Sequence, residues 1–199
     1  CISGSQEFLE MLRVESTKIG ALLIFDEVMT SRLGPSGLQG ILNICPDLTT
    51  LGKYVGGGMS FGAFGGRKDI IDRFDPGRDD AWPHAGTFNN NVLTMNAGLA
   101  GLTKVYTPNL ATSFNTRGDK LRNILNEMAD KYGANMQFTG RGSMMTAHFY
   151  KGEIHNIKDS SDFTKIADIN KKADQSSLRV LNNKVEKEMI TTIKNAQIN

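Results

Sequence analysis

A continuous apolar run that ends in two carboxylates, "ALLIFDEV" at residues 21–28, constrains the fold of this chain more than any other feature. The run has the length of a strand, and an unbroken apolar strand is typical of a parallel sheet that is buried on both faces. An amphipathic stretch, "EFLEMLRVESTK" at residues 7–18, comes before it and predicts a helix that ends near Gly20. Because a helix, a short turn and a buried strand make half of an α/β repeat, the sequence predicts an α/β fold.

The same periodicities predict further elements along the chain. They are strands at residues 46–53 and 61–66, helices at residues 68–74, 92–106 and 109–133, loops at residues 30–40 and 75–87, and strands within residues 135–140 and 143–150. Beyond residue 150 the composition shifts to Lys, Asn, Asp and Ser, with few large apolar side chains. We therefore expect residues 1–150 to form most of one domain and residues 151–199 to be a divergent or truncated segment.

The composition bounds the class of protein. Hydrophobic residues make up 39% of the 199 residues and charged residues 22%, which suits a globular chain with a buried core. The formal net charge is only +2, and no block of Lys and Arg is interleaved with aromatic residues. No apolar run is long enough to span a membrane. We therefore expect neither a nucleic acid nor a membrane as a partner.

The two cysteines, Cys1 and Cys45, provide no disulfide framework and no zinc-ligand spacing. We expect both to be reduced, buried thiols, as is usual in a cytosolic protein, and we expect a cytoplasmic location. The chain begins with Cys1 rather than with methionine, and its first residues read as the middle of a domain. We therefore also expect an N-terminal portion to be missing.

The acidic pair at the end of the apolar run is the first candidate for chemistry. Asp26 lies where a predicted strand ends, and α/β sheets bind their ligands at the carboxyl ends of strands. The alternative for an isolated aspartate is that it caps the turn that follows. A metal site would need more ligands at coordinating spacing, and the histidines, His84, His148 and His155, are scattered. We therefore expect no metal.

Lys53 lies at the end of the next predicted strand, so it is expected at the same edge of the sheet as Asp26. An amine held among apolar groups has a lowered pKa and so reaches the neutral form that a Schiff base needs. An acid beside a Schiff-base lysine is what pyridoxal phosphate requires, because the acid keeps the ring nitrogen protonated and the lysine holds the aldehyde. The glycines from Gly56 to Gly58 indicate that something comes close to the backbone here.

A rival motif lies in the same glycine-rich stretch. "GMSFG" at residues 58–62 matches the G-x-S-x-G nucleophile elbow of serine hydrolases, with Ser60 as the nucleophile. That elbow needs a strand before the serine and a helix directly after it, whereas the residues after Ser60 read as a strand or a turn. A hydrolase is therefore the weaker alternative.

Three stretches of the chain together resemble the core of class III aminotransferases, and most of all the members similar to glutamate-1-semialdehyde aminomutase. They are "LLIFDEVMTSRLG", "PDLTTLGKYVGGGMSFGAFGGRKDI" and "HAGTFNNNVLTMNAGLAGL". The resemblance covers residues 1–150 and implies the pyridoxal-phosphate-dependent transferase fold of type I. In that fold a mostly parallel sheet is flanked by helices, and here the large domain would be incomplete.

The resemblance also implies roles for individual residues. Asp26 pairs with the pyridine nitrogen of pyridoxal 5'-phosphate, and Val28 packs against one face of its ring. Lys53 forms the Schiff base with the cofactor and moves the proton between substrate and cofactor carbons. Gly86 and Thr87 bind the phosphate, reaching across from the partner subunit of a homodimer. The glycines after Lys53 would keep the backbone slim where the cofactor and the partner chain crowd together.

The implied activity moves an amino group between an amino acid or amine and a carbonyl compound. The sequence does not identify the substrate, and an aminomutase would use the same residues. A truncated paralogue without activity is a further alternative, because the phosphate loop that the family carries upstream is not in this chain. Two more interpretations concern the loop and helix around Gly86. Asn89, Asn90 and Asn91 are interpreted as helix caps, and Trp82 and His84 as residues near the pocket.

Overall fold

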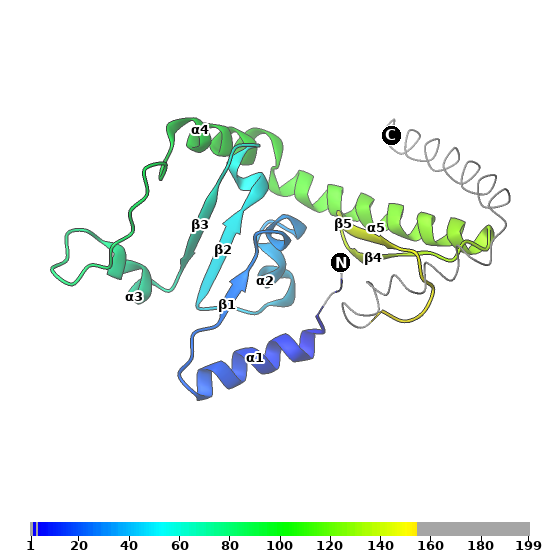
Figure 1. The fold of residues 1–199 in the computed structure, drawn as a ribbon, viewed down its shortest axis with the longest axis horizontal. Coiled ribbons are helices and arrows are strands. Elements are labelled where there is room, and N and C mark those ends of the chain that lie inside the picture. The colour runs from blue at the N-terminus through cyan, green and yellow to red at the C-terminus, as the bar shows by residue number, and fades with distance from the viewer. Residues whose placement is uncertain (1, 3, 155–199) are drawn as a thin grey trace. The chain divides into compact units, whose positions relative to one another are not determined.

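The computed structural model describes residue 2 and residues 4–154, which form two compact units. The first unit runs from Gly4 to Thr116, and the second begins at Arg117. Figure 1 shows the elements of both units along the chain. The predicted boundary near residue 150 stays a prediction, because residues 155–199 lie outside the described residues.

The first unit is built on a three-stranded sheet in the order β1-β2-β3. The strands are β1 (Ile24–Asp26), β2 (Leu48–Gly52) and β3 (Gly62–Gly66). β1 and β2 are parallel, with Asp26 opposite Thr50, whereas β2 and β3 are antiparallel, with Gly52 opposite Gly62. The antiparallel pairing follows from the short turn between β2 and β3, since a parallel neighbour would need a long crossover.

Helices and turns connect these strands. The helices are α1 (Gln6–Lys18), α2 (Gly37–Leu42), α3 (Lys68–Ile71), α4 (Val92–Ala100) and α5 (Pro108–Lys131), which enters the second unit. The 3₁₀ turns are η1 (Thr30–Leu33), η2 (Lys53–Gly56) and η3 (Asp72–Phe74), and η4 (Gly101–Val105) is a π-helical turn that directly follows α4. The helices and strands predicted for residues 7–150 and the loop at residues 75–87 are present, with shifted ends. The loop predicted at residues 30–40 is wrong in part, because η1 and the start of α2 lie there.

Two expectations about burial are wrong for this chain. The run at residues 21–28 contributes a strand of only three residues, and Ile24 in it is 53% exposed rather than buried on both faces. Cys45 is exposed rather than a buried thiol. It follows α2 in the loop that leads to β2, where the chain turns at the surface. Cys1 lies outside the described residues.

The start of the sheet is held by a buried aspartate. Asp47 is only 6% exposed and accepts hydrogen bonds from the Leu23 amide at 2.8 Å, from Arg13 at 2.8 Å and from Arg67 at 3.0 Å. These donors come from α1, from the segment before β1 and from the residue after β3. They hold the pKa of the Asp47 carboxyl well below its usual range, with the Leu23 amide as the largest cause. At the edge of the sheet opposite the candidate site, the Asp47 carboxylate therefore connects α1, the segment before β1 and the residue after β3.

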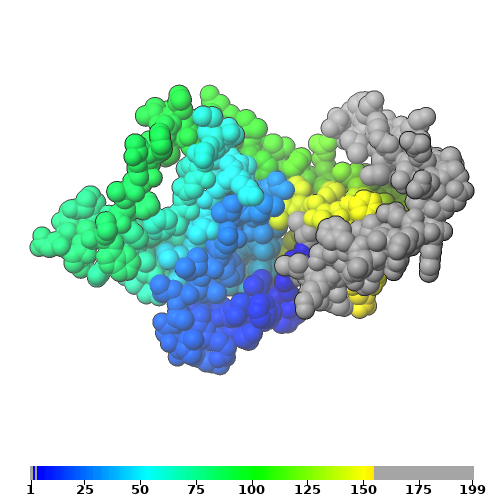
Figure 2. Space-filling model, in the orientation of Figure 1, coloured from blue at the N-terminus to red at the C-terminus, as the bar shows by residue number. Residues whose placement is uncertain are grey.

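The helix α4 starts at a capping asparagine. Asn91 Oδ1 accepts hydrogen bonds from the amides of Leu93 at 3.0 Å and Thr94 at 3.3 Å. The interpretation of Asn91 as a cap is confirmed. Figure 2 shows the segment from η3 to α4, in green, standing out from the rest of the first unit. Phe88, Val92 and Leu93 in it are 84%, 71% and 69% exposed.

The second unit packs a hairpin on the second half of α5. Its strands are β4 (Gln137–Arg141) and β5 (Met144–His148), which pair antiparallel. The side-chain amide of Asn126 donates to the Phe138 carbonyl at 3.0 Å and accepts from the Phe138 amide at 2.7 Å. His148 is buried, and its Nε2 lies 2.8 Å from Thr139 Oγ1. Both strands that were predicted after the long helix are confirmed.

Candidate functional site

Asp26 and Lys53 lie at the same edge of the sheet of the first unit. Asp26 is the last residue of β1 and is paired with Thr50 of the parallel strand β2, while Lys53 directly follows Gly52, the last residue of β2. The strand rise and spacing put the Cα atoms of Asp26 and Lys53 roughly 10 Å apart. The fold therefore brings the predicted acid and the predicted lysine together, at the edge where parallel strands present ligand-binding residues.

The Asp26 carboxylate is oriented through one of its two oxygens. Oδ1 accepts hydrogen bonds from the Val28 amide at 3.0 Å and from the Thr50 hydroxyl at 3.0 Å. The bond to Val28 is the turn cap that we considered as the alternative for this residue. The side chain is exposed, and no residue in the described ranges bonds to Oδ2. Asp26 thus caps its own turn, and its second oxygen has no partner among the described residues.

The neighbouring carboxylate, Glu27, has a structural role. It is 1% exposed and accepts hydrogen bonds from the amides of Leu38 at 2.7 Å and Gln39 at 2.8 Å, and from the Thr30 hydroxyl at 3.0 Å. These bonds satisfy free N–H groups in the first turn of α2. Gly37 has a φ of 69°, and a Cβ there would lie 2.6 Å from Glu27 Oε2, so the carboxylate fills the space that a side chain would take. Glu27 therefore fixes the loop that leaves β1.

Lys53 has an unusual backbone conformation. Its φ is +54°, in the left-handed region, where a residue other than glycine costs about 1–2 kcal/mol and is often functional. Its side chain is exposed, and no described residue forms a hydrogen bond or ion pair with it. The expectation of an apolar setting is therefore wrong within this chain, because Lys53 projects from a strand end at the surface. Val28 does lie close by, since a Cβ on Gly52 would be 3.4 Å from Val28 Cγ1.

The glycines after Lys53 allow two backbones of the same chain to touch. Gly57 has a φ of +62°, and a Cβ there would lie 2.2 Å from the carbonyl oxygen of Ala97 in α4. A Cβ on Gly98 would lie 2.5 Å from the carbonyl oxygen of Val55 in η2. Within the chain, the close neighbour of Gly57 is α4, and a side chain at Gly57 or Gly98 would force the two segments apart. The expectation that a cofactor and a partner chain crowd the glycines after Lys53 stays a prediction.

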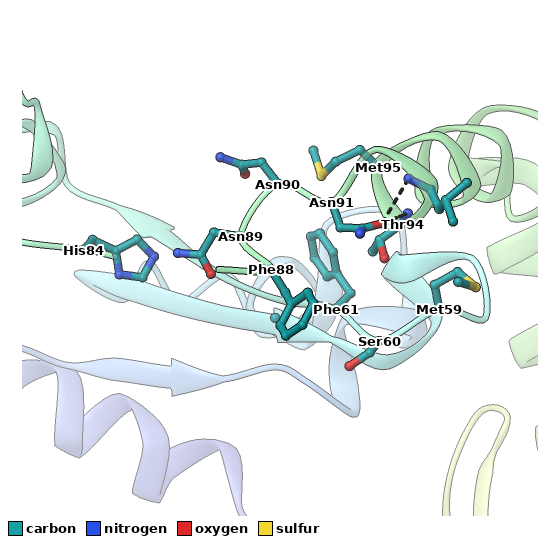
Figure 3. Close-up of a pocket in the computed structure, with 12 residues that line it drawn as sticks. Met59, Ser60, Phe61, His84, Phe88, Asn89, Asn90, Asn91, Thr94 and Met95 are labelled. Carbon is teal, nitrogen blue, oxygen red and sulfur yellow. Dashed lines mark hydrogen bonds between the residues drawn. The ribbon is translucent and has the colours of Figure 1, made fainter. Parts of the chain in front are cut away.

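Gly86 and Thr87 lie in an exposed turn before α4. The Asn89 amide closes this turn by donating to the Gly86 carbonyl at 3.0 Å. The turn borders a cavity of about 640 Å³. Residues 59–62, residues 88–91, His84, Leu93, Thr94 and Met95 line this cavity. Figure 3 shows Phe61 and Phe88 within it and Asn91 bonded to the start of α4. Asp26, Val28 and Lys53 do not line the cavity, so their site and this turn are separate features of one chain.

Ser60 does not have the setting of a hydrolase nucleophile. It follows a turn that starts at η2, and the next element is the strand β3 rather than a helix. The residue is exposed, and no described side chain accepts a hydrogen bond from it. A serine nucleophile needs such a base within hydrogen-bond reach. The prediction that a nucleophile elbow is the weaker alternative agrees with this geometry.

Comparison with known proteins decides the family. The family described as aminotransferase class-III matches residues 1–193, further along the chain than the motifs that carried the resemblance. The chain belongs to the class III aminotransferase family. The enzymes of this family use pyridoxal 5'-phosphate, as the resemblance implied.

Individual relatives of this class III chain are identical to it at about half of the aligned positions. It is 57% identical over 159 residues to a beta-phenylalanine transaminase of Variovorax paradoxus, which covers 80% of this chain and 36% of the relative. It is 41% identical over 159 residues to a glutamate-1-semialdehyde 2,1-aminomutase of Limosilactobacillus reuteri subsp. reuteri, covering 79% of this chain and 36% of the relative. The chain thus spans little more than a third of the curated relatives that it matches.

A solved structure confirms the fold class. The crystal structure of a beta-phenylalanine aminotransferase from Variovorax paradoxus matches with a TM-score of 0.77 and 56% identity, over 81% of this chain and 37% of that chain. The predicted fold type I of pyridoxal-phosphate-dependent transferases is therefore correct. The roles of Asp26, Val28, Lys53, Gly86 and Thr87 stay predictions.

Sequence reasoning missed the residues that support the site of the class III chain. Glu27 was grouped with Asp26 as an acidic pair, and Asp47 was given no role, although both are buried acceptors of several hydrogen bonds. Alternation along a strand could have separated Glu27 from Asp26, because successive side chains point to opposite faces. No local signal identifies Asp47, since its donors come from distant parts of the chain.

Two further findings concern the described residues alone. None of the helices in the described part of the chain combines the length and the apolar character that a membrane crossing requires. Within residues 2 and 4–154, no cluster of three or more His, Cys, Asp and Glu side chains could hold a metal ion.

Proposed function

We propose that this chain carries the cofactor centre of a pyridoxal-phosphate-dependent aminotransferase, with Asp26, Val28 and Lys53 as the residues that hold the cofactor. The observation that carries the proposal is the parallel pairing of β1 with β2, which puts a carboxylate and an amine at one edge of the sheet. Membership of the class III family supports the same reaction class. The residues fit the cofactor, because Asp26 Oδ2 and the Lys53 amine have no partner among the described residues.

Asp26 and its neighbours hold the ring. The Thr50 hydroxyl and the Val28 amide both donate to Oδ1, which orients the carboxylate and leaves Oδ2 for the ring nitrogen. An ionised carboxylate in this position keeps a proton on the ring nitrogen. Val28, which lies against Gly52, provides an apolar surface for one face of the ring. When bound, the cofactor supplies an aldehyde that takes up an amino group and a ring that withdraws electrons.

Lys53 holds the aldehyde end and carries the proton. Its amine emerges from a backbone in the left-handed region, at a strand end that the sheet keeps in place. From there the amine would hold the aldehyde end of the cofactor, and as a general base and acid it would take or give a proton at the substrate carbon. A lysine is suited to both tasks, since its amine is a nucleophile and a base.

The proposed assembly is a homodimer located in the cytoplasm. In it Gly86 and Thr87 bind the phosphate of the cofactor that the partner subunit holds. Their exposure supports this role, as do exposed apolar residues of α4, with Val92 71% and Leu99 63% exposed. Apolar surface on this scale is typical of a face that another chain covers.

The proposed substrates are a small amino donor and a carbonyl acceptor. Similarity to a beta-phenylalanine transaminase makes an aromatic β-amino acid the first donor to test. Similarity to aminomutases makes an internal transfer within an amino aldehyde the second candidate. Analysis of the products with each compound distinguishes the two. An inactive paralogue would bind the cofactor weakly or not at all and would transfer no amino group.

The test is to trap the cofactor on the chain. We expect that incubation of the 199-residue chain with pyridoxal 5'-phosphate, then reduction with borohydride and peptide mapping, gives a modified Lys53. Lys53→Ala abolishes this modification, and Lys68→Ala, which removes an exposed lysine on α3, leaves it unchanged. Asp26→Asn weakens cofactor affinity roughly tenfold to a hundredfold, as expected for loss of a charged hydrogen bond. Modification of another lysine in place of Lys53 would contradict the proposal.

A further inference from the structure

Tyr106 contacts two segments next to the candidate cofactor site, the turn after Asp26 and the turn that begins at Lys53. It follows the π-helical turn η4, and its amide donates to the Gly101 carbonyl at 2.7 Å. Its hydroxyl donates to the carbonyl of Arg32, in the 3₁₀ turn that follows β1 and Asp26. Its ring meets the ring of Tyr54 edge to face, with 5.0 Å between the centroids and an angle of 64°. Tyr54 is the residue next to Lys53.

The acceptor of the Tyr106 hydroxyl is itself held in place. Asn115 Nδ2 donates to the same Arg32 carbonyl at 2.8 Å and to the Ala111 carbonyl at 2.8 Å, and Asn115 is only 7% exposed. The turn that carries Arg32 starts from a fixed point, because the Ser31 amide donates to the Glu27 carbonyl at 3.0 Å. The Arg32 carbonyl therefore accepts hydrogen bonds from two side chains, and Tyr106 provides one of them.

The other end of the link lies at a strained backbone. Lys53, with its φ of +54°, starts the turn η2, and the Gly57 amide donates to the Tyr54 carbonyl at 2.9 Å. A left-handed residue persists only where its surroundings hold it. The edge-to-face contact restrains Tyr54, and an aromatic pair of this kind stabilises beyond its buried area. Partial burial raises the pKa of the Tyr106 hydroxyl, so it remains a donor.

We propose that Tyr106 is a positioning residue that couples the loop after Asp26 to the backbone of Lys53, through its hydroxyl on one side and its ring on the other. The inference rests on the proposed function for its consequence, since it sets the relation between the acid and the amine that hold the cofactor. Its structural part stands alone, because it concerns only contacts within the first unit.

Two variants separate the two halves of the link. Tyr106→Phe removes the hydroxyl and keeps the ring, and Tyr106→Leu removes both. The control is Tyr132→Phe, which deletes a tyrosine hydroxyl in the second unit. Hydrogen exchange of the full chain reports on two amides, that of Ser31 in the loop after Asp26 and that of Gly57 in the turn after Lys53.

We expect Tyr106→Phe to speed exchange at Ser31 roughly threefold to tenfold, the size expected for the loss of one neutral hydrogen bond. We expect Tyr106→Leu to speed exchange at Gly57 as well. The Asp47 amide, bonded to the Leu23 carbonyl at 2.8 Å, keeps its exchange rate in both variants. Unchanged Ser31 and Gly57 amides in Tyr106→Leu would overturn the proposal. Equal acceleration of all three amides would also overturn it, because it would indicate general destabilisation.

Cofactor capture then tests the link to function. If the unsubstituted chain captures pyridoxal 5'-phosphate on Lys53, we expect Tyr106→Phe to weaken that capture roughly threefold to tenfold, with Tyr132→Phe unchanged. Capture on Lys53 with equal affinity in all of these variants would overturn the coupling. Failure of the unsubstituted chain to use Lys53 would refute the proposed function, while the exchange rates would still decide whether Tyr106 positions the two segments.

Discussion

At the scale of single residues, adjacent carboxylates have opposite surroundings. Asp26 is exposed and accepts hydrogen bonds on one oxygen only, whereas Glu27 is 1% exposed and accepts three hydrogen bonds. A buried carboxylate is tolerated only when donors satisfy it. The division follows from the strand, whose successive side chains point to opposite sides. One acid is thereby available to a ligand, and the next stabilises the loop behind it.

The variant Glu27→Ala tests the structural half of this division. It leaves the Leu38 and Gln39 amides without their acceptor, so we expect the free energy of unfolding to fall by about 2–4 kcal/mol. Denaturant titration followed by circular dichroism measures the change. Glu7→Ala, at an exposed position in the first turn of α1, serves as the control and should change stability by less than about 0.5 kcal/mol. Equal effects of the two variants would refute the role of Glu27.

At the scale of elements, the contact between η2 and α4 is made by backbone atoms. The variant Gly57→Ala would put a methyl group 2.2 Å from the Ala97 carbonyl oxygen, in addition to straining a φ of +62°. We expect a loss of about 2–4 kcal/mol in stability, because α4 must move. Thermal or denaturant unfolding measures the loss.

Gly20→Ala is the matched control for Gly57→Ala. Gly20 has a φ of +69°, yet nothing lies within 4 Å of a Cβ there. We expect only the conformational cost of about 1 kcal/mol at this position. If Gly57→Ala costs no more than Gly20→Ala, the close contact with α4 has no energetic weight.

Elements were predictable where the signal was local. The strands β2 and β3 and the helix α1 follow from apolar periodicity within short windows, and the cap at Asn91 follows from the residue type. Asp26 and Lys53 could be paired because both lie at the ends of strands, and parallel strands end at one edge. The exposure of Lys53 and Ile24 was not predictable, since burial depends on which other segments pack against a strand. Tyr106 and Asp47 were missed because their partners are distant in the sequence.

At the scale of the whole molecule, the two units respond to acid through different groups. Burial lowers the pKa of His148 in the folded second unit, so this side chain takes up a proton more readily when unfolded. Its contribution to stability is present above the ordinary histidine value of about 6.5 and is lost as the pH falls below it. In the first unit the pKa of Asp47 is lowered, so its contribution is present above the ordinary value of about 4 and is lost only below that.

We therefore expect acidification to weaken the second unit first. Hydrogen exchange measured from pH 7 to pH 3, corrected for the intrinsic pH dependence, should show β4 and β5 losing protection below about pH 6.5 and β1 and β2 below about pH 4. His148→Gln should remove the upper step and Asp47→Asn the lower one. A single step shared by both units, or an upper step that persists in His148→Gln, would contradict this expectation.

The backbone contact between η2 and α4 also makes that part of the first unit stiff. No side chain lies between the two segments at Gly57 and Gly98 that could change rotamer and absorb a displacement. A push on α4 is therefore passed on to the turn that begins at Lys53. A chain that bound the exposed surface of α4 and displaced this helix would therefore also displace the turn that carries the Lys53 amine.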